Sequence, residues 1–162
     1  MDDSQEGSGF VLDVTGLIGQ YAHGNEPSHH VAYLYTLAGK PWRTHELLNE
    51  IVKTKYINDI NGLCGNNDCG QMSAWYIFTN LGFYPVNPCG GEYVLGAPQL
   101  QKVTINLPNG KTFTVIAENF APENIYVELV TLNGGPYKKN FITNENVMEG
   151  GTLKFYMNSD FQ

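Results

Sequence analysis

The stretch GNNDCGQMSAWY, residues 65–76, joins a polar loop to an apolar helix, and the rest of the chain is organised around it. Its first six residues, Gly65 to Gly70, carry carboxamide and carboxylate side chains, and the residues that follow are almost all apolar. The first amides of a helix have no partner within the helix, so polar side chains at its start lie close to unpaired N–H groups. This loop is therefore the first candidate for a functional site.

The residues after the loop predict a helix that is buried on every side. Apolar residues occupy seven of the eleven positions from 71 to 81 and are spread around the helix, and Gly82 is suited to end the helix as its C-cap. Two more helices are predicted upstream, one over 27–38 that Gly39 stops, and one from Pro41 to about Tyr56. Two helices cannot cover the whole surface of the third, so we expect further partners for it.

Beyond Pro88 the apolar residues alternate with polar ones, a pattern that predicts strands. The expected strands are 92–95, 102–107, 112–116, 125–131 and 153–157, with another extended segment at 10–16. Pro108-Asn109-Gly110-Lys111 is a hairpin signal and Asn133-Gly134-Gly135 a second turn, so antiparallel pairing is expected. Because the helices precede the strands, the fold class predicted is α+β. We divide it into a tail at 1–8, a helical part at 9–88 and an antiparallel β part at 89–162.

The charge and the cysteines narrow the classes of function. The chain has nine Lys and Arg residues against 16 Asp and Glu residues, which gives a formal net charge of −7. This charge argues against nucleic acid or an anionic membrane as a partner. No apolar run approaches the roughly 18 residues of a membrane span, and the acidic start is unlike a signal peptide. The spacing of Cys64, Cys69 and Cys89 fits neither zinc nor redox motifs, and their odd number leaves at least one thiol free.

Asp68 is the leading candidate for a general base. A carboxylate near a helix N-terminus is stabilised in its ionised form, which allows it to hold and deprotonate a water molecule. The alternative is that Asp68 only caps the helix at 71–81. Position alone does not separate these two interpretations.

A second polar cluster, residues 20–30, opens the preceding helical region, and we expect both helix entrances to face one pocket. Its Asn25 and Glu26 offer oxygen ligands that suit Ca²⁺ or Mg²⁺, and together with His23 they could also hydrogen-bond sugar hydroxyls. Side chains at adjacent helical positions diverge by roughly 100°, so at most one of His29 and His30 is expected in the site. His45, on a polar helix face, is expected to be solvated surface.

At these residues the chain resembles the family 92 glycoside hydrolases, the calcium-dependent exo-acting α-mannosidases of bacteria. The resemblance runs from about residue 9 to the end, and its motifs occur in the family's order and spacing. They are GQYAHGNEPSHH (19–30), Pro41-Trp42, GLCGNNDCGQMSAW (62–75), LGFYPVNP (81–88) and GEYVLGAP (91–98).

The resemblance implies an enzyme that removes terminal mannose with inversion of configuration. Asp68 takes the place of the family's general base, and Asn66 stands where a second acidic residue is often found, which leaves Asn66 a water-positioning role. His23, Glu26 and His29 are implied to bind mannose, and Asn25 and Glu26 to help place Ca²⁺. The helices would be the last of an (α/α)6 barrel, and the strands would join a β-sandwich.

Family members are much longer than 162 residues. The resemblance therefore implies a C-terminal fragment whose general acid lies upstream, so we expect the chain alone to be inactive. Its partners would be mannose-terminated glycans and the missing N-terminal part of the enzyme. We also expect self-association through exposed apolar surface. The protein would be located in the periplasm, be secreted, or lie on the bacterial cell surface. An alternative of a different class is a non-catalytic carbohydrate-binding or interaction module that uses the strands.

Overall fold

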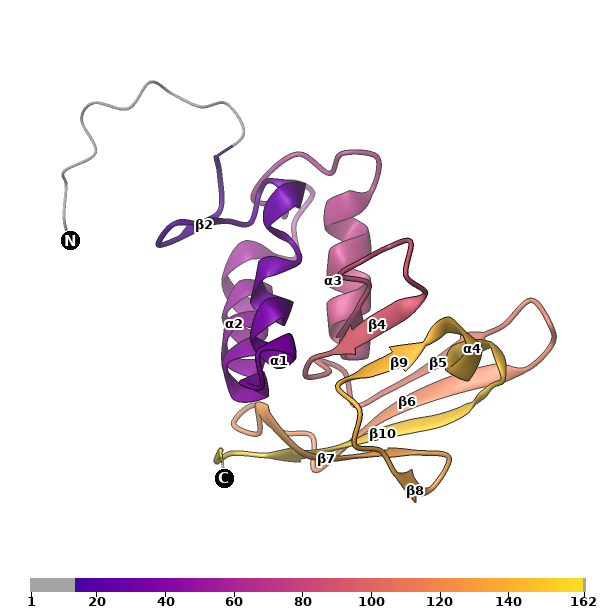
Figure 1. Cartoon of the computed structure of the whole chain (residues 1–162). Coiled ribbons are helices and arrows are strands. Elements are labelled where there is room, and N and C mark those ends of the chain that lie inside the picture. Colours follow the sequence, from indigo (N-terminus) through magenta and orange to yellow (C-terminus); the bar gives the residue numbers. More distant parts are fainter. Residues whose placement is uncertain (1–13, 162) are drawn as a thin grey trace, which may run out of the picture.

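The computed structural model describes residues 14–161, in which helices are followed by two sheets (Figure 1). The mixed helix and strand class matches the prediction. The predicted tail at 1–8 lies outside the described residues, as does most of the extended segment expected at 10–16. Val14 and Thr15, the described part of that segment before Gly16, are not in a strand.

The helical elements are short except for two. They are 3-10 turns at Glu26–Ser28 and Val31–Tyr33, and helices α1 (Leu34–Leu37), α2 (Pro41–Lys55), α3 (Gln71–Leu81) and α4 (Asn144–Met148). Both long helices have the bounds that the sequence predicts, and the amide of Gly82 closes α3 by donating to the Thr79 carbonyl at 2.9 Å. Every helix within residues 14–161 is too short or too polar to cross a lipid bilayer.

The helix predicted over 27–38 is wrong, because this segment forms two 3-10 turns and the short α1. An α-helix would pair the Tyr33 amide with the His29 carbonyl, but that amide donates to His30 instead, at 3.0 Å. The His29 carbonyl accepts from the indole Nε1 of Trp75 at 3.0 Å. A tertiary contact from α3 thus takes the carbonyl that a continuous helix needs.

The strands form a hairpin and two sheets. Their bounds are β1 Leu17–Ile18, β2 Tyr21–Ala22, β3 Phe83–Tyr84, β4 Glu92–Leu95, β5 Lys102–Asn106, β6 Thr112–Glu118, β7 Tyr126–Leu132, β8 Gly135–Pro136, β9 Phe141–Thr143 and β10 Gly151–Asn158. The larger sheet has the order β5-β6-β10-β7-β8, the smaller β3-β4-β9, and β1 pairs with β2. In Figure 1 the smaller sheet lies between α3 and the larger sheet, whereas α2 lies directly against β7.

Both predicted turns join antiparallel neighbours, as expected. The turn 108–111 connects β5 to β6, and Asn133 and Gly134 connect β7 to β8 with φ of 52° and 84°, as a two-residue hairpin requires. One pairing departs from the prediction, since β10 runs parallel to β6. The long connection through β7, β8, β9 and α4 returns the chain in the direction that a parallel neighbour needs.

Two apolar clusters form the core and meet at α3. One gathers residues of the larger sheet, such as Phe113, Leu153 and Phe155, and the other gathers residues of the helices, including Leu48 and Trp75. Phe78 of α3 packs against both. The helix that follows the polar loop therefore joins the two parts of the chain.

Candidate functional site

The loop before α3 holds Asp68 in an uncommon backbone conformation. Asp68, Cys69 and Gly70 all have positive φ, at 41°, 56° and 91°. Positive φ is uncommon for residues other than glycine, and such conformations persist where the surrounding structure holds them, often at functional sites. The Gly70 amide closes the turn by donating to the Asn67 carbonyl at 3.0 Å. The turn leaves the Asp68 side chain exposed.

Asn67, and not Asp68, ties this loop to α3. Its side-chain oxygen accepts hydrogen bonds from the amide of Ser73 at 3.0 Å and from the Ser73 hydroxyl at 3.1 Å. Within residues 14–161, the carboxylate of Asp68 makes no hydrogen bond, and neither does the exposed carboxamide of Asn66. The capping contact considered for Asp68 is thus made by its neighbour, which leaves the carboxylate available for water or ligand.

The second polar cluster borders a cavity. Asn25 precedes the turn Glu26–Ser28 without capping it through its side chain, so capping does not explain this residue. Glu26 lines a cavity of about 230 Å³ together with His30, Gln71 and Tyr84. Carboxylate, imidazole, carboxamide and phenol groups can all exchange hydrogen bonds with hydroxyl groups. The chemistry of these walls therefore suits a sugar.

Three of these wall residues, His30, Gln71 and Tyr84, were not among the predicted site residues. His30 belongs to the polar cluster at 20–30, but helical spacing does not connect it to Glu26, because the segment forms 3-10 turns. Gln71 is the first residue of α3 and directly follows the predicted loop. The rings of His29 and His30 do lie in different surroundings, as expected, but it is His30 that lines the cavity.

His23 is fully buried between two tyrosines. Its Nδ1 lies 2.8 Å from the Tyr21 hydroxyl, and its Nε2 lies 2.7 Å from the hydroxyl of Tyr56. The Tyr56 hydroxyl donates its proton to the Met72 carbonyl at 3.1 Å, so the Nε2 of His23 is the donor to Tyr56 and its Nδ1 the acceptor from Tyr21. Burial lowers the pKa of His23 to about 3, and the ring is neutral.

His29 is 1% exposed and lies against His23, with ring centres 4.9 Å apart. Its Nε2 donates to the His23 carbonyl at 3.0 Å, and its Nδ1 lies 3.4 Å from the Nε2 of Gln71. Burial lowers the pKa of His29, and the bond to the His23 carbonyl and the charge of Glu26 oppose this in part. In the described chain both rings hold the site together, and their direct contact with mannose stays a prediction.

Backbone contact joins the two polar segments, so the two helix entrances do lie together. A Cβ atom on Gly65 would lie 2.6 Å from the Gly24 carbonyl oxygen and 2.7 Å from the Gly24 Cα, which only glycine tolerates. The side-chain Nε2 of Gln71 also donates a hydrogen bond to the Tyr84 hydroxyl at 3.1 Å. Asp68 itself lies outside the lining of the 230 Å³ cavity.

The predicted calcium ligands have suitable chemistry but are few. Asn25 and Glu26 provide oxygen atoms, whereas Ca²⁺ takes about six to eight. Within residues 14–161, no three His, Cys, Asp or Glu side chains gather in a way that could hold a metal ion. These two residues fit part of a calcium site, and the other ligands would have to be carbonyls, water or residues outside this chain.

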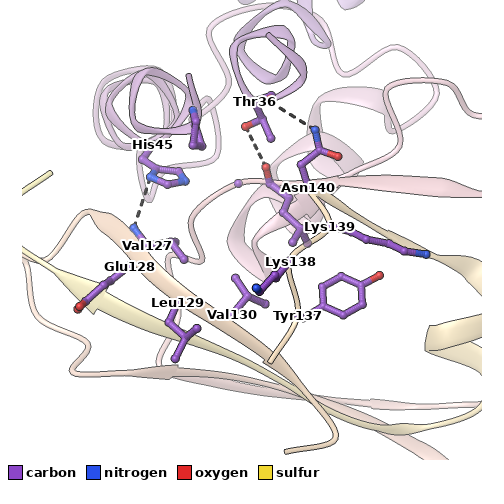
Figure 2. Close-up of a pocket in the computed structure, with 13 residues that line it drawn as sticks. Thr36, His45, Val127, Glu128, Leu129, Val130, Tyr137, Lys138, Lys139 and Asn140 are labelled. Carbon is purple, nitrogen blue, oxygen red and sulfur yellow. Dashed lines mark hydrogen bonds between the residues drawn. The ribbon is translucent and has the colours of Figure 1, made fainter. Parts of the chain in front are cut away.

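The expectation that His45 is solvated surface is wrong. The ring is 4% exposed and lies between α2 and β7, where its Nδ1 accepts from the Val127 amide at 3.4 Å (Figure 2). Burial lowers its pKa to about 4. The polar face of α2 covers the edge of the larger sheet here, which the helical pattern alone could not reveal.

Comparison with known proteins first places the chain among the glycoside hydrolases. The model of the glycosyl hydrolase family 92 catalytic domain matches residues 2–159. The chain belongs to glycoside hydrolase family 92, as its motifs predicted.

Solved structures of this family share its fold. The chain is 43% identical to the family GH92 alpha-mannosidase BT3965 from Bacteroides thetaiotaomicron in complex with mannoimidazole, over 91% of this chain, with a TM-score of 0.88. It is also 43% identical to the inverting mannosidase BT2199 from the same species, over 88% of the chain, with a TM-score of 0.81. A protein of Arthroderma benhamiae described as an uncharacterized secreted glycosidase is 34% identical over 85% of the chain.

The chain spans about a fifth of the length of these relatives, namely 20% and 19% of the two mannosidases and 18% of the secreted glycosidase.

Proposed function

We propose that this chain supplies the general base and part of the sugar site of an inverting, exo-acting α-mannosidase that removes terminal mannose from glycans. Family membership and the mannosidase activities named for two relatives support this proposal. The observation that carries it is Asp68: an exposed carboxylate with no hydrogen bond to residues 14–161, on a turn that Asn67 ties to α3.

In the proposed reaction, Asp68 accepts a proton from water while the water oxygen bonds to the anomeric carbon. The glycosidic bond breaks on the opposite face, and a general acid gives its proton to the leaving oxygen. Inverting enzymes hold these two carboxyl groups about 6.5–9.5 Å apart, which leaves room for the water. Asn66 would orient the water, and Glu26, His23 and His29 would bind or position the sugar hydroxyls.

Asn25 and Glu26 would contribute to holding Ca²⁺. A hard cation bound there would supply positive charge that holds neighbouring sugar hydroxyls. Gln71 would keep the Glu26 segment and the start of α3 at a fixed distance, since it contacts both His29 and Tyr84.

The helices of the chain would be the last of an (α/α)6 barrel, and the general acid would lie in the four fifths of the family's length that the chain does not span. Tyr76 and Ile77 on α3 are 38% and 59% exposed, although the sequence predicts burial on all sides. Ile60, in the loop before α3, is 97% exposed. Further barrel helices would cover these side chains, and without them we expect the chain to self-associate. A monomer in light scattering would count against that expectation.

A chimaera tests the role of Asp68. Residues 14–161 would replace the matching fifth of the mannosidase BT3965, and hydrolysis of an aryl α-mannoside would be measured. Asp68→Ala should lower kcat by at least about 100-fold, and azide should restore turnover with a mannosyl azide as product, because azide needs no base. Asp59→Ala, in a neighbouring exposed turn, is the matched control. Loss of activity without azide rescue would remove Asp68 from the role of base.

The isolated chain distinguishes the enzyme fragment from a binding module. We expect no hydrolysis of aryl α-mannosides, with or without calcium. Calorimetry with mannose should show calcium-dependent binding that Glu26→Ala abolishes. Calcium-independent binding that survives Glu26→Ala would favour the carbohydrate-binding module instead.

We also propose that the enzyme acts outside the cytoplasm, supported by the relative described as secreted. Bacterial origin stays a prediction, since the relatives come from both Bacteroides thetaiotaomicron and Arthroderma benhamiae. The coding sequence upstream of Met1 would show whether an export signal is present.

A further inference from the structure

A second cavity, of about 390 Å³, lies between the helices and the larger sheet, and none of its lining residues belongs to either polar segment (Figure 2). Its volume is within the range of small-molecule sites, about 300–1,000 Å³. The chain creates this space by changing sheets. The Tyr137 amide still donates to Val130 of β7 at 2.9 Å, but three residues later the Asn140 carbonyl accepts from Leu95 of β4 at 2.8 Å. The crossing segment leaves β7, and α2 closes the gap above it.

The ring of His45 in this cavity has a defined proton position. Its Nδ1 accepts the Val127 amide and therefore carries no proton. Since burial lowers the pKa of His45 to about 4, the ring is neutral at neutral pH and its proton is on Nε2.

This Nε2–H group is open to the cavity. It has no hydrogen-bond partner among residues 14–161, although the residue is only 4% exposed. Because the ring lines the cavity, the cavity is where a partner for Nε2–H can sit.

The charge around the cavity favours an anion, against the net charge of −7 for the whole chain. Lys138 and Lys139 line the cavity, and one carboxylate residue, Glu128, does so as well. Figure 2 shows both the Glu128 carboxylate and the Lys139 ammonium pointing away from the cavity, and the Lys139 Nζ lies 5.5 Å from the centre of the Phe141 ring. Lys138 is therefore the charged donor at the cavity. The other walls include the apolar side chains of Leu95 and Val130.

We propose that the cavity beside His45 binds a carboxylate carried on a small apolar body, with Nε2–H of His45 and the Lys138 ammonium donating to the carboxylate. A carboxylate accepts from both donors at once, and hydrogen bonds with an ionised partner are stronger than neutral ones. The apolar body would replace water against Leu95 and Val130. This carboxylate can belong to a free organic acid or to an acidic side chain of a polypeptide segment.

Nitrogen-15 NMR of the full chain, labelled at histidine, tests the proposal. The probes are sodium isovalerate, its neutral analogue isovaleramide, and acetyl-Leu-Glu-Leu-amide beside the same peptide with Gln. A saturable shift of the His45 Nε2 resonance by isovalerate assigns the site to a free acid, and a tighter response to the Glu peptide assigns it to a polypeptide. No saturable shift by either carboxylate, or equal affinity for the neutral analogues, would overturn the proposal.

Variants separate the two donors from a general effect on folding. Lys138→Met should weaken binding of the carboxylate by about 5-fold or more, because it removes the charged donor at an exposed position. Lys102→Met, on β5 and outside the cavity, is the matched control and should leave the affinity unchanged. His45→Phe should weaken binding by about 10-fold or more. Unchanged affinity in Lys138→Met would refute the role of the ammonium group whether or not His45→Phe folds.

Discussion

The chain should lose stability steeply in mild acid, because histidines are buried in their neutral form. Burial lowers the pKa of His23 to about 3 and that of His45 to about 4, from 6.5 for an exposed ring, and it also lowers the pKa of His29. Below pH 6.5 the unfolded chain therefore binds protons that the folded chain refuses. Stability is greatest above pH 6.5 and falls as the pH drops toward the folded-state pKa values.

The size of the loss follows from these pKa values. Between pH 7 and pH 4.5, His23 and His45 each favour the unfolded state by roughly 2.5 kcal/mol more, or about 5 kcal/mol together. Near pH 5 the slope is about 2.5 kcal/mol per pH unit for the pair, and His29 adds to it in the same direction. A typical domain has only about 5–15 kcal/mol of stability. We therefore expect the fold to be marginal or lost near pH 4.5.

Urea unfolding at several pH values between 4.5 and 7.5 measures how the free energy of unfolding depends on pH, with the fluorescence of the buried Trp75 as the signal. His45→Gln removes the contribution of one of these rings, and in this variant the slope near pH 5 should fall by about 1.2 kcal/mol per pH unit. An unfolding free energy that stays constant from pH 7 to pH 5 would show that these rings do not titrate as their burial requires.

Three substitutions near the site should have distinct effects on stability. Gly65→Ala should lower the free energy of unfolding in urea by more than about 1 kcal/mol, because the added Cβ would meet Gly24. Gly135→Ala is the control and should lower it clearly less, because its added Cβ would have no contact closer than 3.7 Å. Equal costs would contradict the close approach. Asn67→Ala should cost about 1 kcal/mol in the same assay by removing both bonds to Ser73. Asp68→Asn should change stability by less than about 0.5 kcal/mol, since the carboxylate makes no hydrogen bond to described residues; a larger loss would point back to a structural role.

The parts of the fold that the sequence predicted are those that depend on neighbouring residues. The apolar run of α3 with Gly82 after it, and the Asn109-Gly110 turn, each specify their structure within a dozen residues. The parallel pairing of β10 with β6 depends on a long connection, and no local pattern records it. The same limit applies to the segment 27–38, where Trp75, far along the chain, takes the carbonyl of His29.

In the candidate site, too, the features set by neighbouring residues could be predicted, and those set by distant residues could not. The polar residues around Asp68 and Glu26 were visible as two clusters, and the structure joins them through Gly24 and Gly65. The sequence offered Asp68 as a cap for α3, but Asn67 makes that contact. The two side chains are equally suitable, and only the turn geometry selects between them. The cavity beside His45 could not be predicted, since it forms where the chain passes from one sheet to the other.

The central place of β10 in the larger sheet has a consequence for how the chain folds as it is synthesised. β10 follows all other strands of residues 14–161, yet it lies between β6 and β7 and pairs with both. Until residue 158 has left the ribosome, β6 and β7 have unpaired edges that face each other across an empty position. Unpaired edges are templates for pairing with other chains. The nascent chain is therefore most open to aggregation immediately before β10 emerges, and slow synthesis or early termination at that point would be more harmful than a change in an outer strand such as β5.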